Sequence, residues 1–319
     1  MFYRYLAWAA KATLTLAPLT VGAEEGGSGH YMPGSMASFV DAVPAVPTFI
    51  ARLNVIGYTG NVDVNKVLPI GGMVATGVDA KVQGYGLTLA WRPRMELPKG
   101  WSYAVGATIP LLHVSTTANA AVPVVSKEVS KSDSENGLGD IVFQPVMVNY
   151  QVDADFAING RLSVYAPTGH YGVGRLANTG KNYWTYEPTI ALVYFGQKNG
   201  IEAAAYVGLS VNTENKDTQY KSGSQFHIDG NVAQHFPTPY GVFSAGLASY
   251  YYKQVSADSG VGATLGDFKA RTMGIGPSAS WITKVGGHDL IAEFKWLHET
   301  NVSNRLKGEI YFLKVVTKF

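Results

Sequence analysis

Cysteine is absent from the sequence, and charged residues are scarce. With no cysteine in 319 residues, the chain has no disulfide, no thiolate metal site and no cysteine nucleophile. Charged residues make up 15% of the chain, against about 25% in an ordinary soluble domain. The formal net charge is +2, and no run of Lys or Arg is present, which excludes a nucleic-acid binder. Glycine and tyrosine are abundant instead, at 36 and 19 residues, and this combination is not typical of a soluble enzyme.

The first 23 residues have the pattern of a secretory signal peptide. A basic start is followed by the apolar stretch 12–21 and by small residues that end at Ala23. This order is typical of exported proteins. A buried helix is the alternative, but Pro18 would break it. We therefore predict a signal peptide over residues 1–23 and a mature chain that starts at Glu24.

The mature sequence alternates between apolar and polar residues. It has no run of about 18 apolar residues, so no transmembrane helix is predicted. At the C-terminus, Tyr311 and Leu313 lie on one face and Lys314 on the other, which indicates a strand with different surroundings on its two faces. About twelve such segments occur, most of them about 9–13 residues long, as tilted membrane-crossing strands require. The predicted strands lie near residues 47–58, 84–92, 101–112, 138–150, 155–165, 183–195, 200–211, 225–236, 240–253, 269–283, 288–298 and 307–319.

The connections between these strands alternate in length. Long connections such as 113–137 and 166–182 are followed by short ones such as 151–154 and 196–199, which is typical of short periplasmic turns and long external loops. The sequence therefore predicts an all-β fold, a transmembrane antiparallel up-and-down barrel of about 12 strands over residues 47–319, in the bacterial outer membrane. Aromatic girdles are expected at both rims. The outer girdle would consist of Tyr58, Tyr165, Tyr183, Trp184, Tyr250, Tyr251, Tyr252 and Trp296.

Several segments resemble a known family. The residues after the cleavage site include Gly29-His30-Tyr31-Met32-Pro33-Gly34 and Phe39-Val40-Asp41-Ala42, and they resemble the start of the outer-membrane channel family labelled meta-pathway of phenol degradation. Gly137-Leu138-Gly139-Asp140 and Tyr165-Ala166-Pro167-Thr168-Gly169 are further matches. The resemblance implies a 12-stranded barrel that moves small, often aromatic or hydrophobic, compounds across the outer membrane. It implies the fold and the functional class but not the cargo.

Residues 24–46 are too rich in Gly and Pro to form a long strand. Irregular backbone is tolerated at membrane depth where protein or water surrounds it. We therefore predict that this segment folds into the lumen, or across its periplasmic mouth, as a plug. The alternative is a loose periplasmic tail. The side chains that we assign to the plug, and that a tail would not need, are His30, Tyr31, Met32 and Phe39.

The inner faces of the predicted strands carry charged and histidine side chains. A 12-stranded barrel lies between small barrels filled by side chains and open porins of about 16–18 strands, so a narrow or plugged path is expected. The signs of the charges are mixed, which predicts weak ion selectivity, and most charges are expected to pair because an unpaired buried charge is costly. The predicted lumen-lining residues are Arg52, Arg92, Asp155, Arg161, Glu187, Glu202, His227, Asp229, His235, Glu293, Lys295 and Lys314.

The function predicted from these features is passive uptake of small molecules, hydrophobic or aromatic ones among them, by a monomeric channel. The expected partners are a small-molecule solute and outer-membrane lipid. The last strand ends at Phe319, which resembles the signal that the barrel assembly machinery reads. No catalytic residue, cofactor, metal site or nucleic-acid partner is predicted.

Two other functions stay open at this point. The first is a lipid-modifying barrel enzyme: His113 and Ser115 lie two apart on one strand face with Leu111, and an outer-membrane phospholipase uses such an arrangement. No asparagine is placed by the sequence to orient the histidine, so this function is disfavoured. The second is an adhesion or assembly barrel, for which the loop 118–135 is long and polar enough.

Overall fold

The computed structural model describes residues 20–21, 25–121, 128–266 and 269–319. The predicted signal peptide, residues 1–23, lies outside the described residues apart from the short strand β1 (Thr20–Val21). Two 3-10 turns, η1 (Glu25–Gly27) and η2 (Phe39–Asp41), precede the barrel. The strands that follow are β2 (Thr48–Asn61), β3 (Lys66–Ile70), β4 (Met73–Arg92), β5 (Trp101–Ala121), β6 (Glu128–Leu138), β7 (Val142–Gln151), β8 (Phe156–Tyr165), β9 (Thr185–Phe195), β10 (Ile201–Asn212), β11 (Gln225–Thr238), β12 (Gly241–Gln254), β13 (Arg271–Val285), β14 (His288–Ser303) and β15 (Lys307–Lys318).

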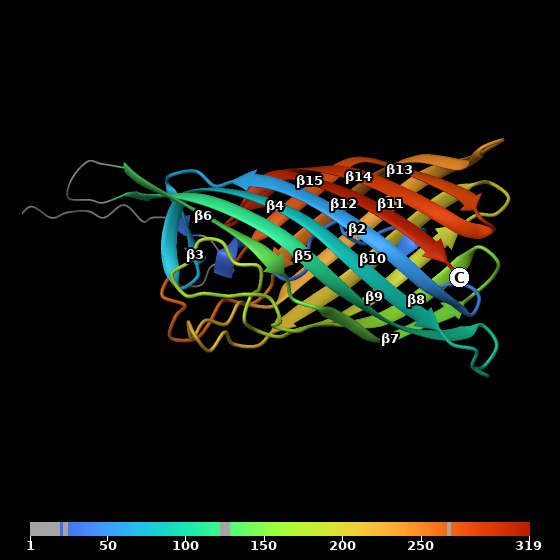
Figure 1. Ribbon diagram of the computed structural model, residues 1–319, viewed down its shortest axis with the longest axis horizontal. Helices are drawn as coiled ribbons and strands as arrows, with labels where there is room; N and C mark the ends of the chain where they lie inside the picture. The colour runs from blue at the N-terminus through green and yellow to red at the C-terminus, as the bar shows by residue number, and fades with distance from the viewer. Residues whose placement is uncertain (1–19, 22–24, 122–127, 267–268) are drawn as a thin grey trace, which may run out of the picture.

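The strands close into an antiparallel barrel (Figure 1). Neighbours along the chain pair with each other, and β15 returns to pair with β2, which closes the wall. β6 and β7 together make one wall strand, interrupted at residues 139–141, while β3 forms a hairpin with the outer end of β4. The wall therefore has 12 strands, and the predicted fold class is confirmed.

Side chains alternate between the two surfaces of the wall because successive residues of a strand point to opposite faces. Ile190 and Val232 are 62% and 60% exposed on the outer surface, whereas their neighbours Thr189, Ala191 and Ala233 are buried toward the lumen. The outside of the barrel thus presents the apolar belt that lipid requires. Among the described residues, no helix is long and apolar enough to cross a membrane.

The outer end of the barrel contains more strand than the alternation predicted. β4 begins at Met73 rather than near residue 84, and β5 and β6 extend as a paired ribbon through much of the predicted loop 113–137 (Figure 1). The hydroxyls of Thr117 and Ser132 face each other at 2.9 Å across this ribbon. Where both faces of a strand meet water, apolar residues no longer alternate with polar ones, so the sequence pattern is lost. The tip of the ribbon, residues 122–127, lies outside the described residues.

The predicted outer aromatic girdle is wrong for several tyrosines. The side chains concerned are buried inside the barrel: Tyr58, Tyr165, Tyr183, Tyr250 and Tyr252. Their hydroxyls find polar partners there, as when Tyr250 donates to Glu299 at 2.7 Å, so the amphipathic ring suits the lumen as well as it suits a lipid interface. The opposite rim does expose aromatic rings, including Trp91, Trp101 and Tyr240.

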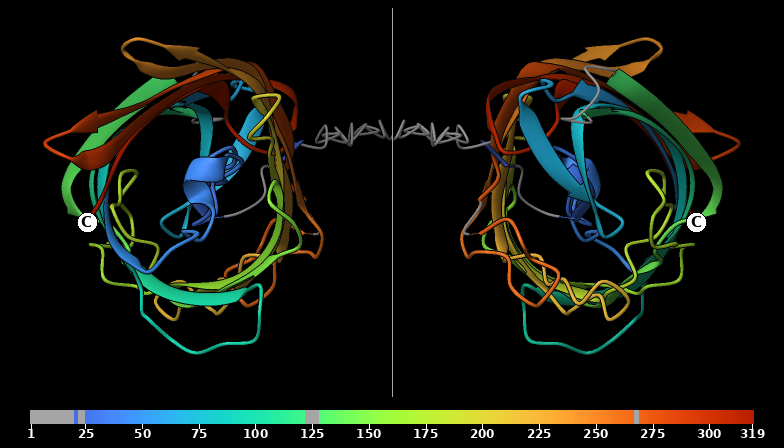
Figure 2. Two further views of the ribbon diagram at one scale, coloured as in Figure 1. Left: turned by 90° about the vertical axis from the view of Figure 1, so that its right-hand side faces the viewer. Right: turned by 90° about the vertical axis from the view of Figure 1, so that its left-hand side faces the viewer.

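Residues 25–47, hereafter the N-terminal segment, lie inside the ring of strands, where Figure 2 shows them in blue. Gly34 turns the chain there with a φ of +83°, and a Cβ atom at this position would lie 2.3 Å from Leu297 of the wall. Only glycine permits both the conformation and the approach. Met32 packs against the apolar cluster at the outer end of the lumen, and Phe39 packs against a second one around Tyr206.

Candidate functional site

A cavity of about 370 Å³ lies inside the barrel, between the N-terminal segment and the inner faces of β2, β4 and β5. Toward the long external loops, its lining combines apolar side chains such as Val82 and Leu112 with the charged side chains of Glu25, Lys181 and Arg305. Its inner part is polar. There, Asn54 Nδ2 donates to Thr88 Oγ1 at 2.9 Å, and the hydroxyls of Thr88 and Thr108 lie 2.7 Å apart. The cavity therefore offers a solute both apolar and polar surfaces.

Buried acids and histidines on β10 and β11 hold the N-terminal segment on the opposite side of the lumen. Asp229 accepts hydrogen bonds from the Tyr31 hydroxyl and, at 3.0 Å, from the Gly34 N–H. The ring of Tyr31 also stacks on His227, with the ring centroids 3.7 Å apart. Because these groups are completely buried, they need such partners.

The turn η2 is fixed in the same way, one strand along the wall. Glu202 accepts from the Phe39 N–H at 3.0 Å and lies 2.9 Å from His235 Nε2. The Phe39 ring packs edge-on against His235, with centroids 5.6 Å apart, and 4.9 Å from the ring of Phe195. Both the backbone and the side chain of Phe39 are therefore recognised by the wall.

Basic side chains on a second group of wall strands, β2, β14 and β15, also bind the segment. Lys295 donates to the backbone carbonyl of Gly34 at 2.9 Å. Lys314 Nζ lies 2.6 and 2.7 Å from the two carboxylate oxygens of Asp41, and Arg52 Nη1 lies 2.9 Å from the same carboxylate. Asp41 is thus the anion shared by two wall cations.

The segment crosses the lumen at its inner end. Arg161 on β8 donates to the backbone carbonyl of Asp41 at 2.5 Å. The carbonyl of Pro44, three residues after Asp41, accepts a hydrogen bond from Arg92 on β4 at 2.6 Å. The chain therefore passes from one wall to the other beneath the cavity, at the end away from the long loops.

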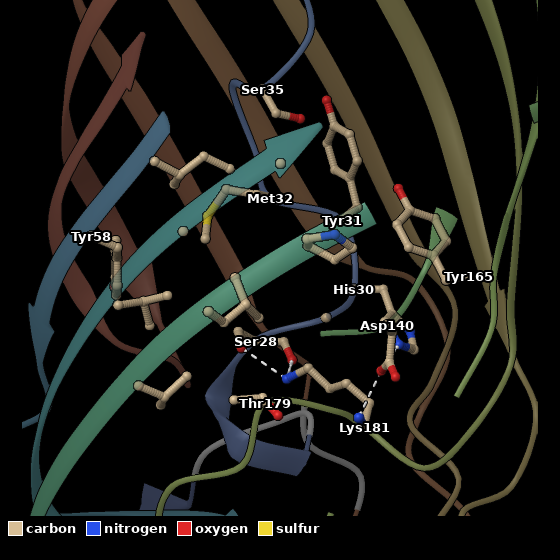
Figure 3. A pocket seen from close by; sticks show the side chains of 18 of the residues that line it. Ser28, His30, Tyr31, Met32, Ser35, Tyr58, Asp140, Tyr165, Thr179 and Lys181 are labelled. Carbon is tan, nitrogen blue, oxygen red and sulfur yellow. Dashed lines mark hydrogen bonds and ion pairs between the residues drawn. The ribbon is translucent and has the colours of Figure 1, made fainter. Parts of the chain in front are cut away.

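His30 anchors the outer end of the segment (Figure 3). Its Nε2 lies 2.8 Å from Asp140 Oδ2, at the interruption between β6 and β7, and its ring stacks on Tyr165 with centroids 5.2 Å apart. Lys181 joins the same group, since its backbone N–H donates to Asp140 at 2.7 Å and its ammonium donates to the carbonyl of Ser28 at 2.5 Å. The external loop 166–184 is thereby connected to the segment.

Burial and charge shift the pKa values of two groups of the segment. Burial alone would raise the pKa of Asp41, but Lys314 and Arg52 outweigh it and hold the pKa of this carboxyl well below its usual range. Burial lowers the pKa of the His30 imidazole, while the neighbouring Asp140 acts in the opposite direction. Asp41 therefore stays an anion at every physiological pH.

The remaining predicted lumen residues have mixed positions. Glu187 accepts from Ser210 at 2.7 Å inside the barrel, and Glu293 lies 3.5 Å from Lys295. Asp155 does not face the lumen: it lies in the turn between β7 and β8, where it accepts from the Gln197 N–H at 3.1 Å. The face assignment placed Asp155 inside by extending the strand one residue too far.

The His113 side chain has an unexpected partner on the outer surface of the barrel. His113 Nδ1 lies 2.5 Å from Asn136 Oδ1 on β6, so the expectation that no asparagine would orient this histidine is wrong. The pairing of β5 with β6 brings the two residues opposite each other, and sequence separation hid this. In the part of the chain that the structure describes, Ser115 makes no hydrogen bond to His113.

Sequence reasoning missed the residues whose partners are backbone groups of the segment. Tyr206 donates to the carbonyl of Ser38 at 3.0 Å, and Asn159 accepts from the N–H of Val43 at 3.0 Å. Asp41 could have been found, because an acid within a Gly/Pro-rich segment that enters a lumen must meet a cation. Within the described ranges, no group of three or more His, Asp and Glu residues could hold a metal ion.

Comparison with known proteins identifies the family. Residues 61–315 match the family described as "MetA-pathway of phenol degradation". The chain belongs to this family. Among solved structures, the COG4313 outer membrane channel from Pseudomonas putida F1 is similar, with a TM-score of 0.64 and 16% identity over 91% of this chain and 100% of that one. The beta domain of the Bordetella autotransporter Brka has a TM-score of 0.46 and 11% identity, over 86% of this chain and 99% of that one. No curated protein matches the sequence significantly.

The predicted family is confirmed. The match includes the segment around Gly139, whereas the segment around His30 lies before its first residue. At 16% identity the Pseudomonas channel shows the fold alone, a 12-stranded barrel. With its closed wall and outer apolar belt, this family member is a β-barrel of the bacterial outer membrane.

Proposed function

We propose that the protein is a passive channel for small molecules, hydrophobic or aromatic ones among them, and that its N-terminal segment narrows the path. One observation carries this proposal: the cavity follows the inner faces of β2, β4 and β5, while Asp229 on β11 and Lys295 on β14 bind the segment on the opposite side of the lumen. The apolar part of the lining, which includes Val82 and Leu112, favours an aromatic or aliphatic body.

The inner end of the path is the constriction in this proposal. Asp41 and Pro44 span the lumen there, held by Lys314, Arg52 and Arg92. Conduction would require this crossing to move aside, which a bound solute or thermal motion could cause. The family similarity supports the functional class, since the Pseudomonas relative is an outer membrane channel.

The proposal is tested by removing residues 24–41 while keeping the signal peptide and the first wall strand. The shortened barrel should still fold, as shown by its heat-dependent gel mobility, and its single-channel conductance in a planar bilayer should exceed that of the full chain. The matched control is Asp155→Asn, a substitution in an exposed turn, which should leave the conductance unchanged. A folded deletion variant that conducts like the full chain would show that the segment does not limit the path.

A lipid hydrolase is the second candidate, because Asn136 lies where it would orient His113. A serine nucleophile must also be within hydrogen-bond reach of the base. Ser115 makes no hydrogen bond to His113 among the described residues, so we rank this function second. Phospholipid hydrolysis by the purified wild-type barrel, absent in Ser115→Ala, would reverse the ranking.

A further inference from the structure

Three acidic side chains of the lumen are covered by protein, so they do not contribute to the charge of the cavity. Glu187, Glu202 and Asp229 lie on β9, β10 and β11, where the N-terminal segment and neighbouring side chains cover them. None of these three lines the cavity. The charged side chains that do line it are Arg52, Arg161, Lys181, Arg305 and Lys314 on the basic side and Glu25, Asp41 and Asp140 on the acidic side. Five bases against three acids leave a surplus of two positive charges.

The acids of the cavity are already saturated by donors of the protein. Asp41 has Lys314 and Arg52. Asp140 accepts from His30 and from two backbone N–H groups, and Glu25 accepts from Tyr171 and Asn215. A carboxylate in this state has little capacity left for a cationic ligand.

Arg161 is in the opposite situation. Its guanidinium donates to the carbonyl of Asp41 at 2.5 Å and lies 3.8 Å from the Met36 sulfur, and it forms no ion pair with a carboxylate in the described part of the chain. Arg52 also lines the cavity, and its buried Nε has no hydrogen-bond partner among the described residues. A guanidinium offers five donors in a planar fork that suits carboxylate and related anions. Arg161 therefore has no anionic partner among the described residues, and one donor of Arg52 is still unused.

We propose that the cavity binds a small amphiphilic anion, with its ring or short chain against Val82 and Leu112 and its anionic group at Arg161 and Arg52. This inference rests on the proposed function and names the class of solute. A volume of about 370 Å³ lies within the range of about 300–1,000 Å³ that small-molecule sites occupy. The mixed signs of the lumen charges in the sequence predicted weak ion selectivity. The surplus of basic side chains in the lining of the cavity favours anions.

The test uses two permanently charged probes of similar size and opposite sign, benzenesulfonate and benzyltrimethylammonium. Binding to the purified, detergent-solubilised barrel is measured by calorimetry, with empty micelles subtracted. Benzenesulfonate should bind at least about tenfold more tightly than the cation, a factor typical of one charge-assisted hydrogen bond. Arg161→Gln should remove most of this preference, whereas Arg161→Lys should retain part of it.

The matched control is Arg92→Gln. Arg92 also faces the lumen and also binds a backbone carbonyl of the segment, but it does not line the cavity. Equal affinity for the two probes, or an equal loss in Arg92→Gln and Arg161→Gln, would overturn the proposed anion site. Arg52→Gln provides a second variant if Arg161→Gln does not fold, and it should lower the affinity for the anion alone.

Ion flux separates this inference from the proposed function. In planar bilayers the reversal potential under a gradient of each probe salt reports which ion passes. Anion binding without any current would support the site and refute the passive channel. Current without a preference for benzenesulfonate, together with equal binding of both probes, would support the channel and refute the site.

Discussion

Replacing Asp41 with asparagine should release the inner end of the N-terminal segment. The Asp41 carboxylate is 2% exposed and lies 2.6 Å from Lys314 Nζ and 2.9 Å from Arg52. Removing one partner of a buried ion pair costs about 3–5 kcal/mol. Arg52 is 20% exposed and Lys314 keeps a contact of 3.4 Å with Glu293, so we take the lower end, about 3 kcal/mol. That energy shifts the docking equilibrium of the segment roughly 100-fold toward release.

Single-channel recording of the purified protein measures this shift. Asp41→Asn should spend a larger fraction of time in a high-conductance state than the wild type. Acid should not reproduce the effect in the wild type. A carboxyl with a lowered pKa stabilises the docked state above its unfolded pKa, about 4, and loses that contribution only as the pH falls through the lowered pKa. Because Asp41 stays ionised at both values, wild-type recordings at pH 7 and pH 4.5 should show the same fraction of time in the high-conductance state.

A double variant serves as the control for this prediction. Asp41→Asn leaves Lys314 without its closest anion, so adding Lys314→Met removes the orphaned cation and should recover part of the folding yield without restoring the closed state. A folded Asp41→Asn barrel whose current matches that of the wild type would refute the claim that this ion pair holds the constriction.

Three further predictions concern the wall and its surface. Ile190→Arg places a cation on the lipid face near the middle of β9 and should lower the free energy of unfolding by about 2–4 kcal/mol. Thr108→Arg, at a position that faces the cavity, should change the free energy of unfolding far less. Equal losses of the two variants in urea titrations would contradict the assignment of the two faces. Ser115→Ala should have the same negligible phospholipid turnover as the wild type in a fluorescent lipase assay, and a wild-type activity lost in the variant would be incompatible with a simple channel. Phe319→Ala should reduce the amount of folded barrel in outer-membrane fractions, because Phe319 is 61% exposed at the end of the last strand; unchanged levels would show that assembly does not read this residue.

Much of the wall could be predicted because lipid and lumen impose opposite demands on alternate residues. β9 illustrates this, since Ile190 and Leu192 face lipid while Thr189 and Ala191 face inward. The alternation of apolar and polar residues is lost where a strand no longer lies between lipid and lumen. Outside the membrane, β5 carries hydroxyl groups at three successive positions, Ser115 to Thr117, and β6 alternates serine with charged residues. The alternation of apolar and polar residues therefore gave no sign that the strands continue there.

The alternation of side chains along each strand predicted which charged residues face the lumen in most cases. It did not predict the partners of these residues. Lys295 and Glu202 bind backbone groups of the segment, and nothing in the local sequence of a strand reveals a backbone partner some 160 to 260 residues away. The expectation of pairing across the wall therefore missed the main role of these charges. Tyr250 shows the same limit, since a ring at a strand end suits either face and only the register decides.

The location of the cavity follows from where the wall offers hydrogen bonds. The segment is an irregular chain, so each buried N–H and carbonyl of its backbone needs a partner, and leaving one unpaired costs about 1–3 kcal/mol. β10, β11 and β14 supply such partners through Glu202, Asp229 and Lys295. Between residues 78 and 88 of β4 and between 108 and 116 of β5, the described side chains donate no hydrogen bond to the segment. There the wall carries small apolar groups, and Thr88 and Thr108 bond to each other. The segment therefore docks on the opposite side, and the space along β4 and β5 remains open for a solute.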